Sequence, residues 1–143
     1  FKVVAPQRSF LTQARTAQRR IYLKQSIQQI FSLAWEDLCR YTIPFLTLCR
    51  EDTSLNQASR YWHKNEPEWD ILAESIDATA LFIGEAKWIA KIPSSSWIYK
   101  IIEELKNKGL PGIARQSKKQ IFYGIFIPEK PKHLELPPHI KVI

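Results

Sequence analysis

The 143-residue sequence contains no methionine, only two cysteines and only three histidines. Neither a disulfide framework nor a zinc cluster is expected from so few sulfur and imidazole groups, and no CxxC, HExxH or zinc-finger spacing occurs. We predict that Cys39 and Cys49 pack as small apolar side chains in a reducing, cytoplasmic environment rather than form a disulfide.

Long apolar runs are also missing. No segment approaches the roughly 18 apolar residues of a membrane span, and no charged segment followed by an apolar one marks a signal peptide, so no membrane partner is expected. Because the first residue is Phe1, we expect the sequence to be a piece of a longer protein. We interpret residues 1–15 as a linker remnant of a missing N-terminal region, and residues 16–143 as one folded domain.

The charge is unbalanced, because 21 Lys and Arg residues stand against 14 Asp and Glu residues, giving a net charge of +7. A positive excess favours an anionic partner such as nucleic acid, although it also serves solubility alone. Hydrophobic residues make up 45% of the chain and charged residues 24%, which is typical of a globular domain and not of a disordered one.

The apolar spacing predicts the order of the elements. Residues 1–13 are expected to be irregular. A helix is expected over about residues 16–40, ended or kinked by Pro44, followed by a short helical piece at 45–50. One apolar face of the long helix carries Ile27, Ile30, Phe31, Ala34 and Leu38, and the other face is polar.

The rest of the chain alternates in a strand-like way around one more helix. Strands are predicted at residues 59–63, 68–75, 79–88, 120–127 and 139–143, and a helix at 97–108 that starts at a Ser cap and ends at Gly109. Residues 111–119 read as a basic loop. The order of helix, three strands, helix and strand predicts an α/β fold in which helices flank a mixed β-sheet.

Three ionisable residues lie inside the apolar strands, where unpaired charge is costly: Asp70, Glu85 and Lys87. Glu85 and Lys87 are two apart on one strand and therefore share a face. A hairpin with the preceding strand, on which Trp69 and Ile71 should face away from Asp70, would bring Asp70 to Glu85. Two carboxylates beside a lysine predict a site for Mg²⁺ or Mn²⁺, with Asp70 and Glu85 as ligands. A surface cluster of salt bridges is the alternative.

Further groups could complete this site. The carbonyl of Ala86 lies between Glu85 and Lys87 and is a candidate metal ligand. Glu36, on the polar side of the first helix, is a candidate catalytic residue or an ordinary solvated carboxylate. Glu68 is a second candidate ligand or an exposed charge at a strand end. A metal held here would activate water against a phosphodiester, and Lys87 would orient that water and stabilise the developing negative charge.

Candidate nucleic-acid contacts lie outside this site. Trp88 and Trp97 are expected either to stack on bases or to pack at the rim of the core. The basic side chains are expected either to hold phosphates or to be solvated. They are Lys91, Lys100, Arg115, Lys118 and Lys119.

The strand motifs also resemble a known superfamily. The sequence EWD, which ends at Asp70, is followed after fourteen residues by EAK, which starts at Glu85. Together with Glu36 on a preceding helix, this pattern resembles the PD-(D/E)XK nucleases, although Trp69 replaces the usual proline. The resemblance implies a restriction-endonuclease-like core in which Asp70, Glu85 and Lys87 are catalytic and Glu36 assists.

A narrower resemblance covers roughly residues 1–110. The segments FKVVAPQRS, AWEDLCR, YWHKNEPEWDILAE and LFIGEAKW are similar to the C-terminal domain of an archaeal-type ATPase family also found in bacteria. The resemblance implies that an ATPase module and a winged helix precede this region. No GxxxxGK[ST] motif occurs here, so ATP binding would belong to the preceding part.

Three function classes therefore stay open. The leading expectation is a Mg²⁺-dependent endonuclease domain that hydrolyses nucleic acid, DNA before RNA, as part of an ATPase. The second is a non-catalytic DNA-binding or protein-interaction module of that ATPase. The third is a structural or oligomerisation domain, which is compatible with a homo-oligomer.

Overall fold

The structure is a computed structural model that describes residues 7–47, 53–115 and 118–143. It divides into two compact units, Phe1–Ala34 and Trp35–Ile143, with the division inside the long helix. Its elements are α1 (Arg8–Gln13), α2 (Thr16–Thr42), the 3-10 helix η2 (Ile43–Phe45), β1 (Ser59–Tyr61), β2 (Trp69–Glu74), β3 (Ala80–Ala86), α3 (Ser95–Asn107), α4 (Gly112–Arg115), β4 (Gln120–Phe126) and β5 (Ile140–Val142).

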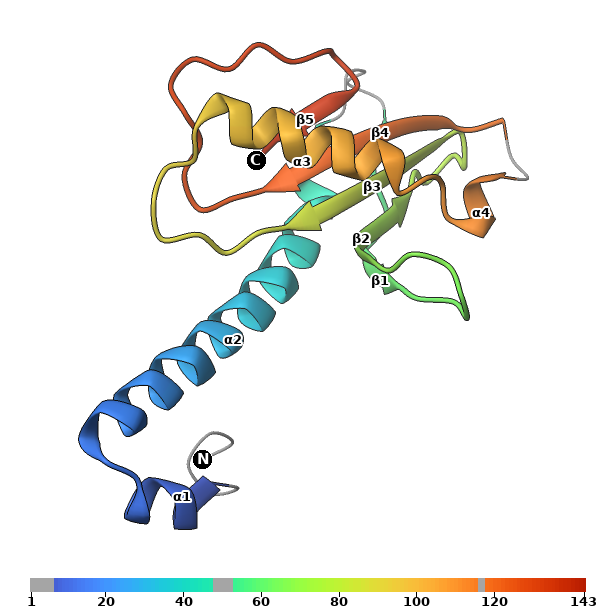
Figure 1. Ribbon diagram of the computed structural model, residues 1–143. Coiled ribbons are helices and arrows are strands. Elements are labelled where there is room, and N and C mark those ends of the chain that lie inside the picture. Colours follow the sequence, from blue (N-terminus) through green and yellow to red (C-terminus); the bar gives the residue numbers. More distant parts are fainter. Residues whose placement is uncertain (1–6, 48–52, 116–117) are drawn as a thin grey trace. The chain divides into compact units, whose positions relative to one another are not determined.

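The second unit is built on a five-stranded mixed sheet in the order β1-β2-β3-β4-β5 (Figure 1). The pairs β1–β2 and β2–β3 are antiparallel, whereas β3–β4 and β4–β5 are parallel. The crossover between the parallel strands β3 and β4 contains α3, which lies across one face of the sheet. This confirms the predicted α/β fold with a mixed sheet, and the predicted helix–strand order.

Apolar side chains fill both faces of the sheet. On one face, the stripe predicted for α3 is buried against β3 and β4, and comprises Ile98, Ile101, Ile102 and Leu105. On the other face, Cys39 and Ile43 pack with Phe82 and Phe126. The central strand β3 is buried along its whole length. The predicted ends of α3 are also present, because Ser94 Oγ accepts a hydrogen bond from the Trp97 N–H at 3.2 Å and Gly109 has a φ of 82°.

The apolar face predicted on α2 is not the side of the helix that packs in the second unit. Its members Ile27, Ile30, Phe31, Ala34 and Leu38 are all exposed. A competing series four residues apart, Trp35, Cys39 and Ile43, packs on the sheet instead. This choice brings Glu36 and Arg40, which share the inward side, to the sheet as well. Although α2 has 27 residues, no helix in the described part of the chain is long and apolar enough to cross a membrane.

The connections near α2 also differ from expectation. Residues 8–13 form α1 rather than an irregular segment, and the ring of Phe10 packs edge-on against Tyr22 at 5.5 Å between centroids. Pro44 lies inside η2, where it needs no amide donor, and Leu46 is already extended, so the helical piece expected at 45–50 is absent at residues 46–47. The remainder of that piece, with Cys49, lies outside the described residues.

A β-bulge shapes the start of β2. Ser59 pairs with Leu72 but Tyr61 pairs with Trp69, so one residue of β1 faces two residues of β2. The extra residue breaks the alternation of side chains. Trp69 and Leu72 therefore share the α3 side, and Ile71 lies on the other. This corrects the expectation that Trp69 and Ile71 share a face.

Candidate functional site

The strands β2 and β3 bring the two predicted acidic residues together. Ile71 pairs with Gly84, and continuing that register by one residue sets Asp70 opposite Glu85. Just beyond the last ladder pair, Asp70 Oδ2 accepts a hydrogen bond from the Ala86 N–H at 3.0 Å. Asp70 thus lies at the bulge, against the end of the strand that carries Glu85 and Lys87.

Glu85 is the most deeply placed of these charges, with only 7% of its surface exposed. Lys87 Nζ donates to Oε2 at 2.7 Å, and Lys108 Nζ donates to Oε1. Burial acts to raise the pKa of Glu85, but the hydrogen bonds from Lys108 and Lys87 outweigh it and lower the pKa. Burial likewise acts to lower the pKa of Lys87, but Glu85 outweighs it and raises the pKa. At neutral pH the contact is therefore an ion pair.

The pKa of Asp70 is shifted in the opposite direction from that of Glu85. Burial, and next the negative charge of Glu85, raise its pKa from 3.8 to about 6, against the opposing effects of the Ala86 N–H and Lys87. The charge of Glu36 also acts to raise it. A buried carboxyl whose pKa is raised by neighbouring negative charge marks a crowded carboxylate site.

Glu36 lies on α2, close enough to Asp70 for its charge to act on that carboxyl. Arg40, one turn along, donates through Nη1 to the carbonyl oxygen of Asp70 at 2.8 Å, and the same Nη1 lies 3.9 Å from Glu36 Oε2. Glu36 Oε2 is buried and finds no hydrogen-bond partner among the residues that the structure describes. The helix therefore presents a third, incompletely satisfied carboxylate beside Asp70.

A small cavity opens next to these groups on the α3 side of the sheet. It has a volume of about 220 Å³ and is lined by Glu85, Lys87, Ile101, Glu104, Leu105 and Lys108. One wall is thus the ion-paired end of β3, and the other is the last turns of α3. Glu85 and Lys87 are reachable from solvent through this opening.

Few side chains here could hold a divalent cation. No group of three or more His, Cys, Asp or Glu side chains in the described ranges is arranged as a ready metal cage. Asp70, Glu85 and the Ala86 carbonyl supply the kind of partial oxygen shell that Mg²⁺ accepts, because it keeps several waters and substrate oxygens. A cation there would relieve the repulsion that helps to raise the pKa of Asp70, and would attract Glu36 Oε2, which accepts no hydrogen bond from the described residues.

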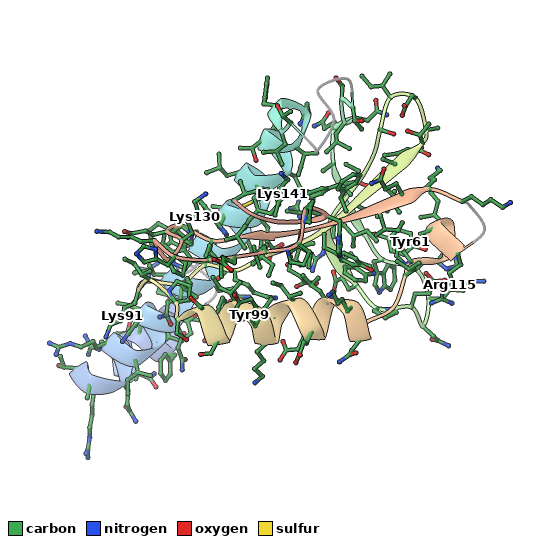
Figure 2. All side chains as sticks on the ribbon, turned by 90° about the horizontal axis from the view of Figure 1, so that it is seen from above. Tyr61, Lys91, Tyr99, Arg115, Lys130 and Lys141 are labelled. Carbon is green, nitrogen blue, oxygen red and sulfur yellow. The ribbon has the colours of Figure 1, made fainter. Side chains whose placement is uncertain are left out.

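The predicted nucleic-acid contacts do not form one surface. Lys91 and Arg115 lie at opposite ends of α3 (Figure 2). Lys100 is on the exposed side of α3, 3.7 Å from Glu104, and Arg115 Nε donates to the carbonyl oxygen of Leu110. Lys119 pairs with Glu74 near the start of β4, at the opposite end of the sheet from Glu85.

The remaining candidates have separate surroundings. Lys118 is exposed beside Lys119. Glu68 is exposed and pairs with Arg60, which favours the strand-end interpretation over a metal ligand. Trp88 is 38% exposed and lies against Trp35 with 5.8 Å between ring centroids. Trp97 is half-buried against the α3 side of the core.

Sequence reasoning missed three residues of the site. Lys108 follows Ile101 and Leu105 at helical spacing, so a charge that continues a buried stripe was the available signal. Arg40 follows Glu36 by one helical turn on the polar side of α2, and that spacing was the available signal. Trp69 contacts Lys108, whose Nζ lies 4.6 Å from the centroid of the Trp69 ring. The β-bulge turns Trp69 to this side of the sheet, and nothing in the sequence predicts that bulge.

Comparison with known proteins gives one match. Residues 1–107 match the family DUF234, described as archaeal and bacterial proteins of unknown function. The chain belongs to the DUF234 family. No curated protein and no solved structure matches it.

The DUF234 match covers well over half of the chain and includes Glu36, Asp70, Glu85 and Lys87. It ends within the last turn of α3, so Lys108, β4 and β5 follow the matched region. The family description assigns no activity, and the chemistry must be argued from the site.

Proposed function

We propose that this DUF234 chain is a metal-dependent nuclease-like domain of the PD-(D/E)XK type, with a restriction-endonuclease-like core. The observation that carries the proposal is the meeting of Asp70, Glu85 and Lys87 where β2 begins and β3 ends, with Glu36 added from α2. Four charged groups at the border of a core are costly to assemble, and a purely structural role would be served by one matched pair.

Each residue has a distinct task in the proposed hydrolysis. Asp70, Glu85 and the Ala86 carbonyl would hold Mg²⁺ or Mn²⁺, which when bound polarises a phosphoryl oxygen and lowers the pKa of a coordinated water. Lys87 is fixed by Glu85 and would direct its ammonium at the attacking water and the charge developing on phosphate. Glu36 would keep Asp70 and its surroundings negative.

The proposed substrate is nucleic acid, and DNA in particular. The net charge of +7 favours a polyanion. Lys91 and Trp97 line one open hollow of about 450 Å³ on the segment that follows Lys87, where a cation for phosphate and an aromatic ring for a base are close together. We further propose that the chain is the C-terminal part of an ATPase, whose nucleotide-binding module would lie elsewhere in the full-length protein.

A second candidate is a non-catalytic DNA-binding or interaction module. The specific observation in its favour is that both oxygens of Glu85 already have a lysine partner. In that case the charges would serve as a folded ion-pair network, and DNA would bind without being cut.

Two measurements separate these functions. Calorimetric titration with Mn²⁺ is expected to show binding to the wild type and none to Asp70→Ala, and equal binding by both contradicts the metal site. Incubation with supercoiled and linear DNA is expected to give cleavage that Glu85→Ala and Lys87→Ala abolish. Lys119→Ala is the matched control, because its ion pair lies at the other end of the sheet. DNA binding without cleavage, equal in all variants, identifies the interaction module.

A further inference from the structure

Lys108 has no role in the proposed hydrolysis, yet its ammonium has two close contacts beside the site. Its ammonium donates to Glu85 Oε1 and lies 4.6 Å from the centroid of the Trp69 ring. The side chain is half-buried. The ammonium of Lys108 thus lies between an aromatic face and a buried carboxylate, and both attract a cation.

The position of this ammonium conflicts with a metal ion at Glu85. Lys87 occupies Oε2, so Oε1 is the oxygen left for a ligand, and Lys108 contacts that oxygen. A divalent cation bound there would stand beside the Lys108 ammonium at short range, where repulsion between like charges is strong. One of the two cations must move.

We infer that Lys108 holds the place of the metal ion at Glu85 and gives it up when a phosphodiester arrives, so that metal and nucleic acid bind cooperatively. The inference rests on the proposed function and adds the order in which that site is filled. Lys108 is then a residue that positions Glu85 in the metal-free protein, and it contacts a phosphate when both metal and nucleic acid are bound.

The surroundings of Lys108 leave space for its ammonium to move, and a bound phosphate would favour that movement. The 220 Å³ cavity is lined by Lys108 together with Glu85 and Lys87, so the ammonium can leave Oε1 without leaving the site. Its flexible four-carbon stem allows such a swing. A phosphate group offers an anion to the displaced ammonium, whereas a metal ion alone would leave it with two positive neighbours, the metal and Lys87.

Removing the charge of Lys108 should therefore make the binding of the metal ion independent of the binding of nucleic acid. Lys108→Met keeps the apolar stem against Trp69, and Lys108→Gln keeps a hydrogen-bond donor to Glu85 without the charge. Either variant should bind Mn²⁺ at least about tenfold more tightly than the wild type in the absence of nucleic acid, since a competing cation is gone. The matched control is Lys106→Met, an exposed lysine on the same turn of α3.

The experiment is a calorimetric Mn²⁺ titration of the full chain, with and without a 12-nucleotide phosphorothioate DNA duplex. The wild type and Lys106→Met should gain at least about tenfold in Mn²⁺ affinity from the duplex, and the Lys108 variants should gain little. Equal Mn²⁺ affinity of the wild type and both Lys108 variants overturns the inference. Should Lys108→Met unfold, as judged by circular dichroism, Lys108→Gln alone decides.

Asp70→Asn separates this failure from failure of the proposed function. If Asp70→Asn loses Mn²⁺ binding while the Lys108 variants behave like the wild type, the metal site stands and only the role of Lys108 is wrong. If Asp70→Asn binds Mn²⁺ as well as every other variant does, the proposed function fails and the inference fails with it.

Discussion

The two ends of the sheet both carry acidic side chains, but only one end satisfies them fully. At the end where β2 turns into β3, Glu74 has Lys119 as its partner, and Asp77 accepts from Ser75 Oγ at 2.6 Å and from the Thr79 N–H at 3.1 Å. The hydrogen bond from Ser75, followed by those from Thr79, lowers the pKa of Asp77.

At the opposite end, the carboxylates crowd one another. The pKa of Asp70 is raised to about 6 by burial and by Glu85, and Glu36 Oε2 has no hydrogen-bond partner in the described part of the chain. Charges that serve the fold are matched one to one. Charges that remain in conflict are retained at a cost, which is the pattern expected of a functional site.

The largest expected effect that tests this contrast is on metal binding. Glu85→Gln removes one proposed ligand charge and should weaken Mn²⁺ binding at least about 100-fold, with cleavage lost in parallel. Isothermal titration calorimetry and a DNA cleavage time course measure the two effects. Glu74→Gln is the counterpart at the other end of the sheet, and a comparable loss there would remove the distinction between the ends.

The next effect is the pH dependence of the metal site. Asp70 is ionised above its raised pKa of about 6 and protonated below it, and only the ionised form is a ligand. Mn²⁺ affinity should therefore level off above about pH 7 and fall by about tenfold per pH unit below about pH 6. Titrations across this range test the prediction, and an affinity independent of pH through about pH 6 contradicts a role for Asp70.

A smaller effect, of opposite sign, is expected on stability. Because the pKa of Asp70 is higher in the folded state, protonation favours folding at low pH, and this contribution is lost as pH rises through about 6. Asp70→Asn should then stabilise the chain by about 1 to 2 kcal/mol at about pH 7.5, after allowance for solvent screening of a partly exposed group.

Urea denaturation measures this gain, which should shrink towards about pH 5 as the wild-type carboxyl becomes protonated. The asparagine Oδ1 can still accept the hydrogen bond from the Ala86 N–H. A destabilised Asp70→Asn at both pH values would show that the carboxylate serves the fold.

The smallest effect is expected where the charges are already matched. Glu74→Gln breaks the ion pair with Lys119 but leaves a partly exposed, hydrogen-bonding side chain, so the loss of stability should be about 1 kcal/mol or less. Thermal melts of Glu74→Gln and the wild type at low and high salt check this. A loss several times larger would mean that this pair, too, is under strain.

Much of the fold followed from local pattern. The strong strand around Phe82, the stripe of α3 with its Ser94 cap and Gly109 end, and the mixed sheet were all predicted from apolar period and turn residues. The face of α2 was not, because two apolar series run along that helix, and only packing against the sheet selects the one through Cys39. The positions of Lys118 and Lys119 likewise depend on where β4 begins.

The sequence alone determined the central unit of the site. Glu85 and Lys87 must share a face because side chains alternate along a strand, and a short hairpin had to bring Asp70 near them. Only the tertiary structure decided what surrounds this unit. The bulge turns Trp69 to the α3 side, Arg40 reaches Asp70 from α2, and Lys108 reaches Glu85 from the end of α3. These contacts join residues that are distant in the chain, so the local sequence pattern does not predict them.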